Sequence, residues 1–338
     1  MLDRDRGAPF NSGMSETPTQ SAAPICWVVS DGRRGIENQA LGLAEAVQTQ
    51  LAARGSALRI GRVIAHKDGS VALPDCGPPD LWIGCGRAAI PLAARHRRTF
   101  ANCFFAYVQD PRSHYRDFDL ILAPAHDRLV RPNAVAMIGS PNRISDTLLA
   151  EGRTTFSAQI EALPGPRAAV LIGGDSKRFR LTPRIADYLI ARLEDLLAQD
   201  ISLMITASRR TPKALRDRLT EVFGTHDRVW LFDGEGENPY FAFLAGADWI
   251  FVTEESTNML VEASATGKPV YALPMEGSAG KFARLHAALE GYGAMRPWLG
   301  KLERWTYTPL SETQRAASVL IDRWHAATRP TILKGDAA

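Results

Sequence analysis

The sequence predicts an α/β protein made of two domains, each with a parallel sheet covered by helices. Short apolar runs, each followed by a polar turn and a helical stretch, recur through residues 25–150 and again through 167–310. Between the two series, residues 151–166 mix Gly, Pro and polar side chains, which is typical of a linker, with room for a short helix. A chain of 338 residues is long enough for two such Rossmann-like domains.

The composition argues against several classes of protein. Lys and Arg exceed Asp and Glu by 40 − 37 = 3, so no strong positive field predicts a nucleic-acid partner. No apolar run approaches the roughly 20 residues of a membrane-spanning helix. Residues 1–24 are rich in Pro, Ser and Thr, which predicts a disordered tail without a signal peptide. We therefore expect a cytoplasmic protein whose membrane contact, if any, is peripheral.

Two local groups were considered for other chemistry. The cysteines at 26, 76, 85 and 103 show neither paired short spacing nor a histidine at metal-ligand distance, which predicts reduced thiols and no metal site. The basic run Arg95-His96-Arg97-Arg98 ends a predicted helix, where cations suit the helix dipole. This run is interpreted as a solvated face, and a membrane-surface patch is the alternative.

The first domain is predicted to contain strands that each end in a polar turn or loop. These strands cover residues 25–29, 81–83, 103–108 and 120–123. The glycine-containing turn 30–35, before a helix over about 36–53, matches neither a Rossmann nor a Walker spacing, so its signal for a dinucleotide or ATP is weak. Asn38 and Gln39 on the first turn of this helix are interpreted as ligand contacts, with helix-surface polarity as the alternative. Asp110 and His126 lie in loops at the ligand-binding edge of the sheet and are candidate general bases, although a loop histidine is more often structural.

The second domain repeats the pattern, and three of its strand-to-helix turns carry residues suited to a diphosphate. Its strands are expected at 168–172, 202–206, 229–232, 247–252 and 270–274. Gly173 and Gly174 allow close approach to a diphosphate, and Arg209 offers a bidentate grip on it. Ser256 is a plausible N-cap of a helix over 258–266, whose first amides can bind an anion. The convergence of these turns predicts a nucleotide site.

Glu262 extends this prediction from a nucleotide to a nucleotide sugar. It lies about two turns into the helix 258–266, too far to touch a phosphate at the helix N-terminus but able to meet the hydroxyls of an attached sugar. The alternative is an ordinary strand–helix unit with a glutamate on its surface.

Several motifs, taken together and in their order along the chain, match the pattern of one protein family. They are Ser30-Asp31-Gly32-Arg33, Asn38 through Ala44, Gln109-Asp110-Pro111, His126-Asp127, Ser208 through Pro212, Asn238-Pro239-Tyr240 and Thr253 through Met259. With these motifs the chain resembles the Elm family of mitochondrial fission proteins over residues 25–325. It departs from the family pattern at Glu255–Met259, where the family usually has Asp followed by Ser-Val-Ser-Met. That difference places any essential Asp there in doubt.

The resemblance implies a fold and a function. The second domain is similar to the donor half of GT-B glycosyltransferases, so we expect two facing domains with a cleft between them. We also expect a tail helix, residues 311–328, that crosses back onto the first domain. Some bacterial members are regarded as lipooligosaccharide-core sugar transferases. We therefore expect transfer of a sugar from a nucleotide-diphosphate donor to a glycolipid acceptor at the cytoplasmic membrane face.

The resemblance also implies roles for individual residues. Lys281 would face the diphosphate, Glu262 would hold the ribose, and the backbone after Trp230 would meet the base. Deprotonation of the acceptor would come from the first domain, by Asp31, Asp110 or His126. The predicted nucleotide-sugar contacts are Gly173, Gly174, Lys177, Ser208, Arg209, Arg210, Leu231, Asn238, Glu255, Ser256, Glu262 and Lys281. No metal or resident cofactor is needed, since the nucleotide sugar is a co-substrate and its leaving diphosphate can be held electrostatically.

Two other functions stay open. Plant members of the family are known as fission factors, which makes a non-catalytic membrane-division adaptor with a degenerate transferase fold one alternative. A nucleotide-sugar epimerase is the other, because that class shares the fold. An adaptor should tolerate loss of charge at the donor site, and an epimerase should turn over the donor without an acceptor.

Overall fold

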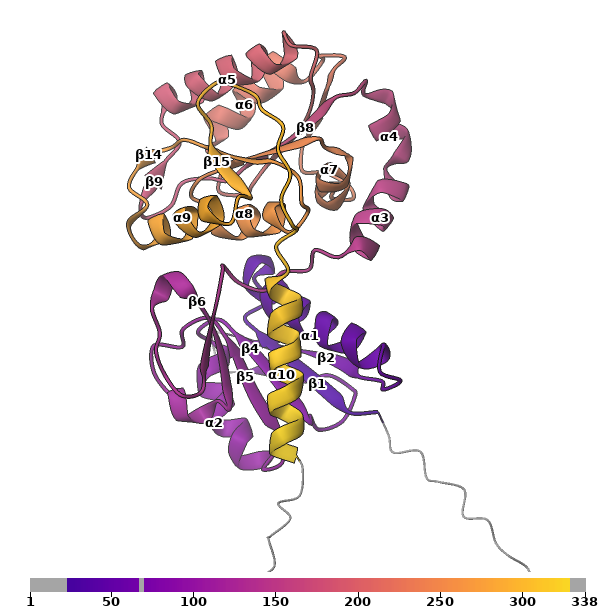
Figure 1. Ribbon diagram of the computed structural model, residues 1–338, viewed down its shortest axis with the longest axis vertical. Helices are drawn as coiled ribbons and strands as arrows, with labels where there is room; N and C mark the ends of the chain where they lie inside the picture. Colours follow the sequence, from indigo (N-terminus) through magenta and orange to yellow (C-terminus); the bar gives the residue numbers. More distant parts are fainter. Residues whose placement is uncertain (1–22, 67–69, 329–338) are drawn as a thin grey trace, which may run out of the picture.

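The computed structural model describes residues 23–66 and 70–328. Apart from residues 23 and 24, the expected disordered tail lies outside the described residues. The described chain forms two α/β domains stacked along the long axis of the molecule, with α10 (Glu312–Thr328) running from their junction down the first domain (Figure 1). The predicted fold class, including the crossing tail helix, is confirmed.

The first domain is built on one mostly parallel sheet. Its strands are β1 (Ile25–Ser30), β2 (Arg59–Ala65), β3 (Val71–Ala72), β4 (Leu81–Cys85), β5 (Phe104–Val108), β6 (Leu120–Pro124) and β7 (Ala134–Met137). They lie in the order β3-β2-β1-β4-β5-β6-β7, and among the described pairs only β2 with β3 is antiparallel. The central strands β1, β4, β5 and β6 are buried almost throughout, which is why they appear in the sequence as continuous apolar runs.

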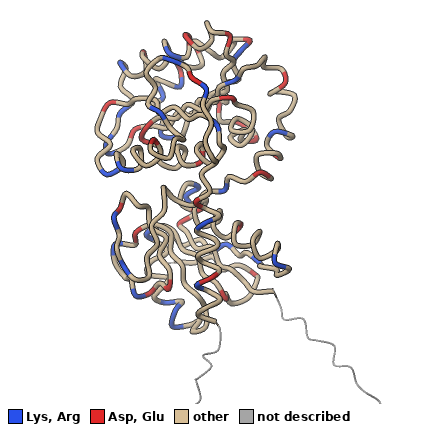
Figure 2. The backbone as a smooth tube through the Cα atoms, in the orientation of Figure 1, with Lys and Arg blue, Asp and Glu red and all other residues tan. Residues whose placement is uncertain are grey.

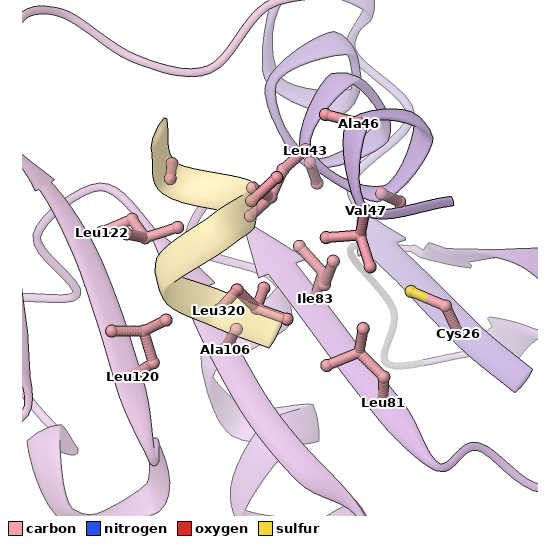
Figure 3. Close-up of a cluster of buried hydrophobic side chains, with 14 of the residues drawn as sticks. Cys26, Leu43, Ala46, Val47, Leu81, Ile83, Ala106, Leu120, Leu122 and Leu320 are labelled. Atoms are coloured by element: carbon pink, nitrogen blue, oxygen red, sulfur yellow. The ribbon is translucent and has the colours of Figure 1, made fainter. Parts of the chain in front are cut away.

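Helices cover both faces of this sheet. They are α1 (Arg34–Ala52) and α2 (Ala89–Thr99), together with the short 3₁₀ turns η1 (Tyr115–Asp117) and η2 (Ala125–Asp127). One face packs on α1 and α10, where Leu320 of α10 meets Leu43, Ile83 and Ala106 in a single apolar cluster (Figure 3). This burial explains why the tail helix returns to the first domain: its apolar stripe completes that domain's core.

The second domain is built on a wholly parallel sheet. Its strands are β8 (Arg167–Ile172), β10 (Ser202–Ala207), β11 (Val229–Phe232), β12 (Trp249–Thr253), β13 (Val270–Leu273) and β15 (Met295–Pro297). They lie in the order β11-β10-β8-β12-β13-β15. A small antiparallel pair, β9 (Phe179–Arg180) with β14 (Glu276–Gly277), lies apart from it. The helices are α5 (Pro183–Leu197), α6 (Lys213–Phe223), α7 (Tyr240–Gly246), α8 (Thr257–Ser264) and α9 (Ala283–Gly291), with η3 (Gly280–Phe282) before α9.

The predicted linker, residues 151–166, differs from expectation because most of it is helical. It contains the second half of α3 (Asp146–Thr155) and all of α4 (Ser157–Ala162). Gly152 explains the packing of α3 on α7: a Cβ there would lie only 2.9 Å from the backbone nitrogen of Ala242. The segment therefore packs on the second domain and is not a separate linker between the two domains.

Charged residues of both signs are spread over both domains (Figure 2). In the basic run at the end of α2, His96 is buried and its Nδ1 accepts the indole N–H of Trp82 at 3.1 Å. Arg97 makes a bidentate pair with Asp119, while Arg95 and Arg98 remain exposed. The cysteines of the sequence are all free thiols, and three of them are buried.

Candidate functional site

A pocket of about 600 Å³ lies where the two domains meet. The first domain supplies most of its wall, from the loops at the carboxyl ends of its strands and from the start of α2. The second domain closes it with the first turn of α8 and with η3. The lining residues used below are Gln39, Arg87, Gln109, Asp110, Arg112, His126, Asp127, Asn258, Lys281 and Phe282. Three residues predicted for the site, Asp110, His126 and Lys281, are brought together here.

His126 is placed in the pocket by η2, directly after β6. Its side chain is only 7% exposed, and Nδ1 is closed off from solvent without a hydrogen-bond partner among the described residues. The ring meets Phe282 edge-on, with centroids 5.5 Å apart. Burial, reinforced by the charges of Lys281 and Arg284, lowers the pKa of His126 against the opposing effect of Asp127. The imidazole is therefore neutral near pH 7 and able to accept a proton.

Two buried carboxylates flank this histidine, and each already has partners. Asp110 accepts the backbone N–H of Arg112 at 2.8 Å and the hydroxyl of Tyr115 at 3.0 Å, with its side chain 7% exposed. The Arg112 guanidinium lies 3.3 Å from Asp110 and 3.7 Å from Asp127. Asp110 thus lies in the pocket as predicted, and its oxygens are engaged in shaping the loop.

Lys281 lies across the domain interface from these carboxylates. Its ammonium forms an ion pair with Asp127 of the first domain, and the neighbouring Arg284 donates to the His126 carbonyl at 2.7 Å. Lys281 was expected to face the donor diphosphate. In the structure it is paired with a first-domain carboxylate, because η3 packs directly against η2.

A chain of amides forms a second bridge between the domains. Gln109 donates to Gln39 at 2.9 Å, and Gln39 in turn donates to Asn258 at 3.3 Å. Asn258 also donates to the carbonyl of Gly35 at 3.2 Å. The positions of oxygen and nitrogen in each side-chain amide are assigned from these hydrogen bonds. The interpretation of Gln39 as a surface residue is wrong, since the side chain is buried in the pocket wall.

The donor-side turns of the second domain lie close together, as predicted. However, the Gly173 and Gly174 amides are used in hydrogen bonds between these turns. Gly174 donates its amide to buried Glu255 at 2.8 Å, and Gly173 donates to Thr253 at the same distance. A Cβ on Gly174 would lie 2.2 Å from the Arg210 backbone, so this glycine is needed for packing between the two turns. Arg210 reaches Glu255 at 3.6 Å. Burial raises the pKa of Glu255 against the hydrogen bonds and the charge that favour ionisation.

Glu262 has a protein partner at the start of α7. The hydroxyl of Tyr240 donates to the Glu262 carboxylate, and burial raises the pKa of Glu262 to about 7. Asn238 caps the same helix by accepting the amide of Tyr240 at 3.0 Å. Lys268, which follows α8, does not pair with Glu262: its ammonium donates to the carbonyls of Leu244 and Ala245.

The remaining predicted residues of the second domain differ in what they contact. Ser256 holds the N-cap position of α8, but its hydroxyl caps no amide among the described residues. Arg209 and Lys177 are exposed and have no ion pair within the described chain. Ser208 accepts the Arg210 amide at 3.2 Å, and Leu231 lies in β11.

Asp31 does not line the pocket. Burial opposes its ionisation, but hydrogen bonds and charge from Arg33 outweigh this and lower the pKa of Asp31.

Backbone strain marks pocket residues that the sequence did not assign. Gln109, Arg112 and His114 have φ values of 88°, 65° and 57°, a region unusual for residues other than glycine. All three line the pocket. Strain of this kind persists where surrounding structure enforces it, often at functional sites. The sequence signal was present in the Gln109-Asp110-Pro111 motif, but only the structure gives Gln109 and Arg112 their roles.

Comparison with known proteins identifies the family of the chain. The profile of the family described as "Mitochondrial fission ELM1" matches residues 34–324. The chain belongs to the mitochondrial fission ELM1 family. It is 30% identical over 267 residues to the mitochondrial fission protein ELM1 of Arabidopsis thaliana, covering 71% of this chain and 62% of that protein. An uncharacterised protein of Rickettsia prowazekii is 26% identical over 348 residues. The match covers 87% of this chain and 97% of the Rickettsia protein.

Solved structures give this ELM1-family protein a GT-B-type fold. The UDP-GlcNAc 2-epimerase of Methanocaldococcus jannaschii matches with a TM-score of 0.56 and 12% identity, covering 88% of this chain and 99% of that chain. A structure of the same enzyme in complex with UDP-GlcNAc and UDP matches with a TM-score of 0.53 and 9% identity. This match covers 88% of this chain and 98% of that chain. At such identities the likeness concerns the fold. In the described part of the chain, no helix is long and apolar enough to cross a membrane.

Proposed function

We propose that this ELM1-family protein is a glycosyltransferase that moves a sugar from a nucleoside-diphosphate donor to a glycolipid acceptor, with His126 as the general base. The observation that carries the proposal is the pocket at the domain junction, with a buried, neutral histidine in its wall. Its volume of about 600 Å³ falls within the usual range for a small-molecule site.

The position of the pocket favours a transferase over an epimerase. An epimerase needs room for one nucleotide sugar, whereas a transferase needs a second site beside the donor. Most of the wall comes from first-domain loops, while Thr257 and Asn258 follow directly after the donor-side residues Glu255 and Ser256. An acceptor in the pocket would therefore lie next to a donor held by the second domain.

In the proposed reaction the acceptor hydroxyl attacks the anomeric carbon of the donor sugar. The bond from that carbon to the diphosphate oxygen breaks, the nucleoside diphosphate leaves, and the hydroxyl proton passes to His126. Exposed Arg209 and the N-terminal end of α8 supply positive potential for the diphosphate, so the scheme requires no metal. Glu262 beside Tyr240 is assigned to the donor ribose. The acceptor is membrane-linked, and the protein works peripherally at the cytoplasmic face.

The test is donor turnover with and without an acceptor. The protein is mixed with UDP-GlcNAc, UDP-glucose or GDP-mannose, in the presence or absence of a bacterial glycolipid extract, and nucleoside diphosphate release is followed. Release should depend on the extract, and His126→Asn should lower it by about 10²–10⁴-fold. His325→Asn, an exposed histidine of α10, is the matched control and should keep full activity.

The other outcomes identify the rival functions. Conversion of the donor sugar without any acceptor would make the protein an epimerase. Neither binding nor turnover of any nucleotide sugar would favour the non-catalytic adaptor; the Arabidopsis relative is named as a mitochondrial fission protein.

A further inference from the structure

The N-terminal end of α2 forms one wall of the pocket, and no acidic side chain lies in its first turn. Arg87, Ile90 and Pro91 line the pocket at this end of the helix. The first turn of α2 contains no acidic residue, and the N-cap residue Ala88 provides no side-chain cap. Within the described chain, the amides of Arg87 and Ala88 have no hydrogen-bond acceptor. This end of the pocket therefore presents free donors and the positive pole of a helix.

Among the described residues, the ion pairs around the pocket leave the side chain of Arg87 without a partner. Each carboxylate in the wall has a basic partner: Asp110 pairs with Arg112, and Asp127 pairs with Lys281. The exposed Arg87 forms no ion pair or side-chain hydrogen bond with any described residue. Its guanidinium, with donors arranged to grip an oxyanion in two places, is thus available to a ligand.

His126 is a second polar group of the pocket wall that the described residues leave without a partner. Its side chain is more than nine-tenths buried in the pocket wall, and Nδ1 has no partner among the described residues. Buried polar atoms are rarely left unsatisfied in folded proteins, and exceptions often mark a functional group. An anion nearby would also stabilise the imidazolium that forms when His126 takes a proton.

We propose that the Arg87 end of the pocket binds a phosphate group carried by the acceptor. The inference rests on the proposed function, since it names the class of acceptor: a phosphorylated sugar. A phosphate suits the site because its several oxygens can accept the free amides and the Arg87 guanidinium together. The phosphate then holds the acceptor while its hydroxyl faces His126.

The test measures binding of phosphorylated probes to the whole protein by calorimetry, without nucleotide. Glucose 1-phosphate represents a water-soluble acceptor, and dodecyl glucoside 6-phosphate in detergent micelles represents a lipid-linked one. Arg87→Gln should weaken binding by about 10- to 100-fold, the loss expected for a charge-assisted hydrogen bond. Arg87→Lys should retain part of the affinity. Arg95→Gln, an exposed arginine of α2 outside the pocket, is the control and should change nothing.

The outcomes separate this inference from the proposed function. Arg87-dependent binding of either probe supports the phosphate site, and the tighter probe shows whether the acceptor is soluble or lipid-linked. Phosphate binding that is absent, or equal in Arg87→Gln and Arg95→Gln, overturns it. UDP affinity is measured on the same samples. If UDP binds and the phosphate probes do not, only this inference fails; if the probes bind and UDP does not, the donor reaction fails and the anion site stands.

Discussion

Lys281 of the second domain forms an ion pair with Asp127 of the first, and the pair joins opposite walls of the pocket. Asp127 is largely buried and Lys281 is about one-third exposed, at 7% and 36% of the side chain. The contact therefore links the geometry around His126 to the relative position of the domains.

Removing this link should loosen the domain interface. Lys281→Met leaves buried Asp127 with Arg112, at 3.7 Å, as its remaining ion-pair partner among the described residues. We expect the population of open conformations to rise and the radius of gyration to increase in small-angle scattering. Lys301→Met is the control, because Lys301 pairs with Glu303 within the second domain. Scattering curves that coincide for both variants and the parent would show that the pair does not hold the domains together.

The same variant should shift the titration of His126. Burial is the main cause of its lowered pKa, and the charge of Lys281 adds to the effect while Asp127 opposes it. In the parent, the imidazole signals should titrate below the ordinary value of 6.5. Lys281→Met removes a positive charge and leaves Asp127 less neutralised, so the pKa should rise. NMR titration of the ring protons measures it, and an unchanged or lower value contradicts the electrostatic explanation.

Glu262 should make stability depend on pH. Its pKa in the folded protein is about 7, above the ordinary 4.5, so folding favours the protonated acid. That contribution is complete below about pH 4.5 and is lost as the pH rises through 7. Relative to Glu262→Gln, the parent should therefore lose about 1–3 kcal/mol of stability between pH 5 and pH 8. Urea denaturation at both pH values tests this, with exposed Glu290→Gln as control. A difference between parent and Glu262→Gln that is independent of pH would contradict a raised pKa.

Gly174 should be intolerant of a side chain. A methyl group there would lie 2.2 Å from the Arg210 carbonyl, so the turn carrying Ser208 and Arg210 must move. Gly174→Ala should cost about 1–3 kcal/mol, the usual cost of overpacking. Gly291→Ala, where nothing lies within 4 Å of the new carbon, should be neutral or stabilising. Equal melting temperatures for the two variants would mean that the donor-side turns are not tightly packed.

Buried strands were predictable from the sequence, whereas several outer strands were not; the edge strand β11 is an exception. β5 and β12 are buried throughout and appear as unbroken apolar runs, which is why their positions were predicted correctly. β2 was missed because the exposed Arg59 and Arg62 interrupt its apolar residues. β15 is short, with two of its three residues exposed. In these strands the hydrophobic pattern is weak, and pairing with a neighbour decides the conformation.

The candidate site was predictable only in part, for a related reason. The rule that polar loops gather at the carboxyl ends of parallel strands placed Asp110 and His126 at one edge of the sheet, and both line the pocket. It could not pair Lys281 with Asp127, which are 154 residues apart and meet only through domain packing. It also could not show that the Gly173 and Gly174 amides are used within the protein. Such contacts depend on how whole domains fit together.

The most direct test of the account is calorimetric titration of UDP into the parent protein, Arg209→Gln and Arg216→Gln. Arg209 is exposed beside the donor-side turns, and Arg216 is an exposed arginine on α6. The account predicts that the parent binds UDP and that Arg209→Gln weakens binding by about 1.5–3 kcal/mol, the contribution of a hydrogen bond to a charged group. Arg216→Gln should bind as the parent does. If the intact protein binds neither UDP nor any other nucleoside diphosphate, its proposed role as a nucleotide-sugar enzyme is contradicted.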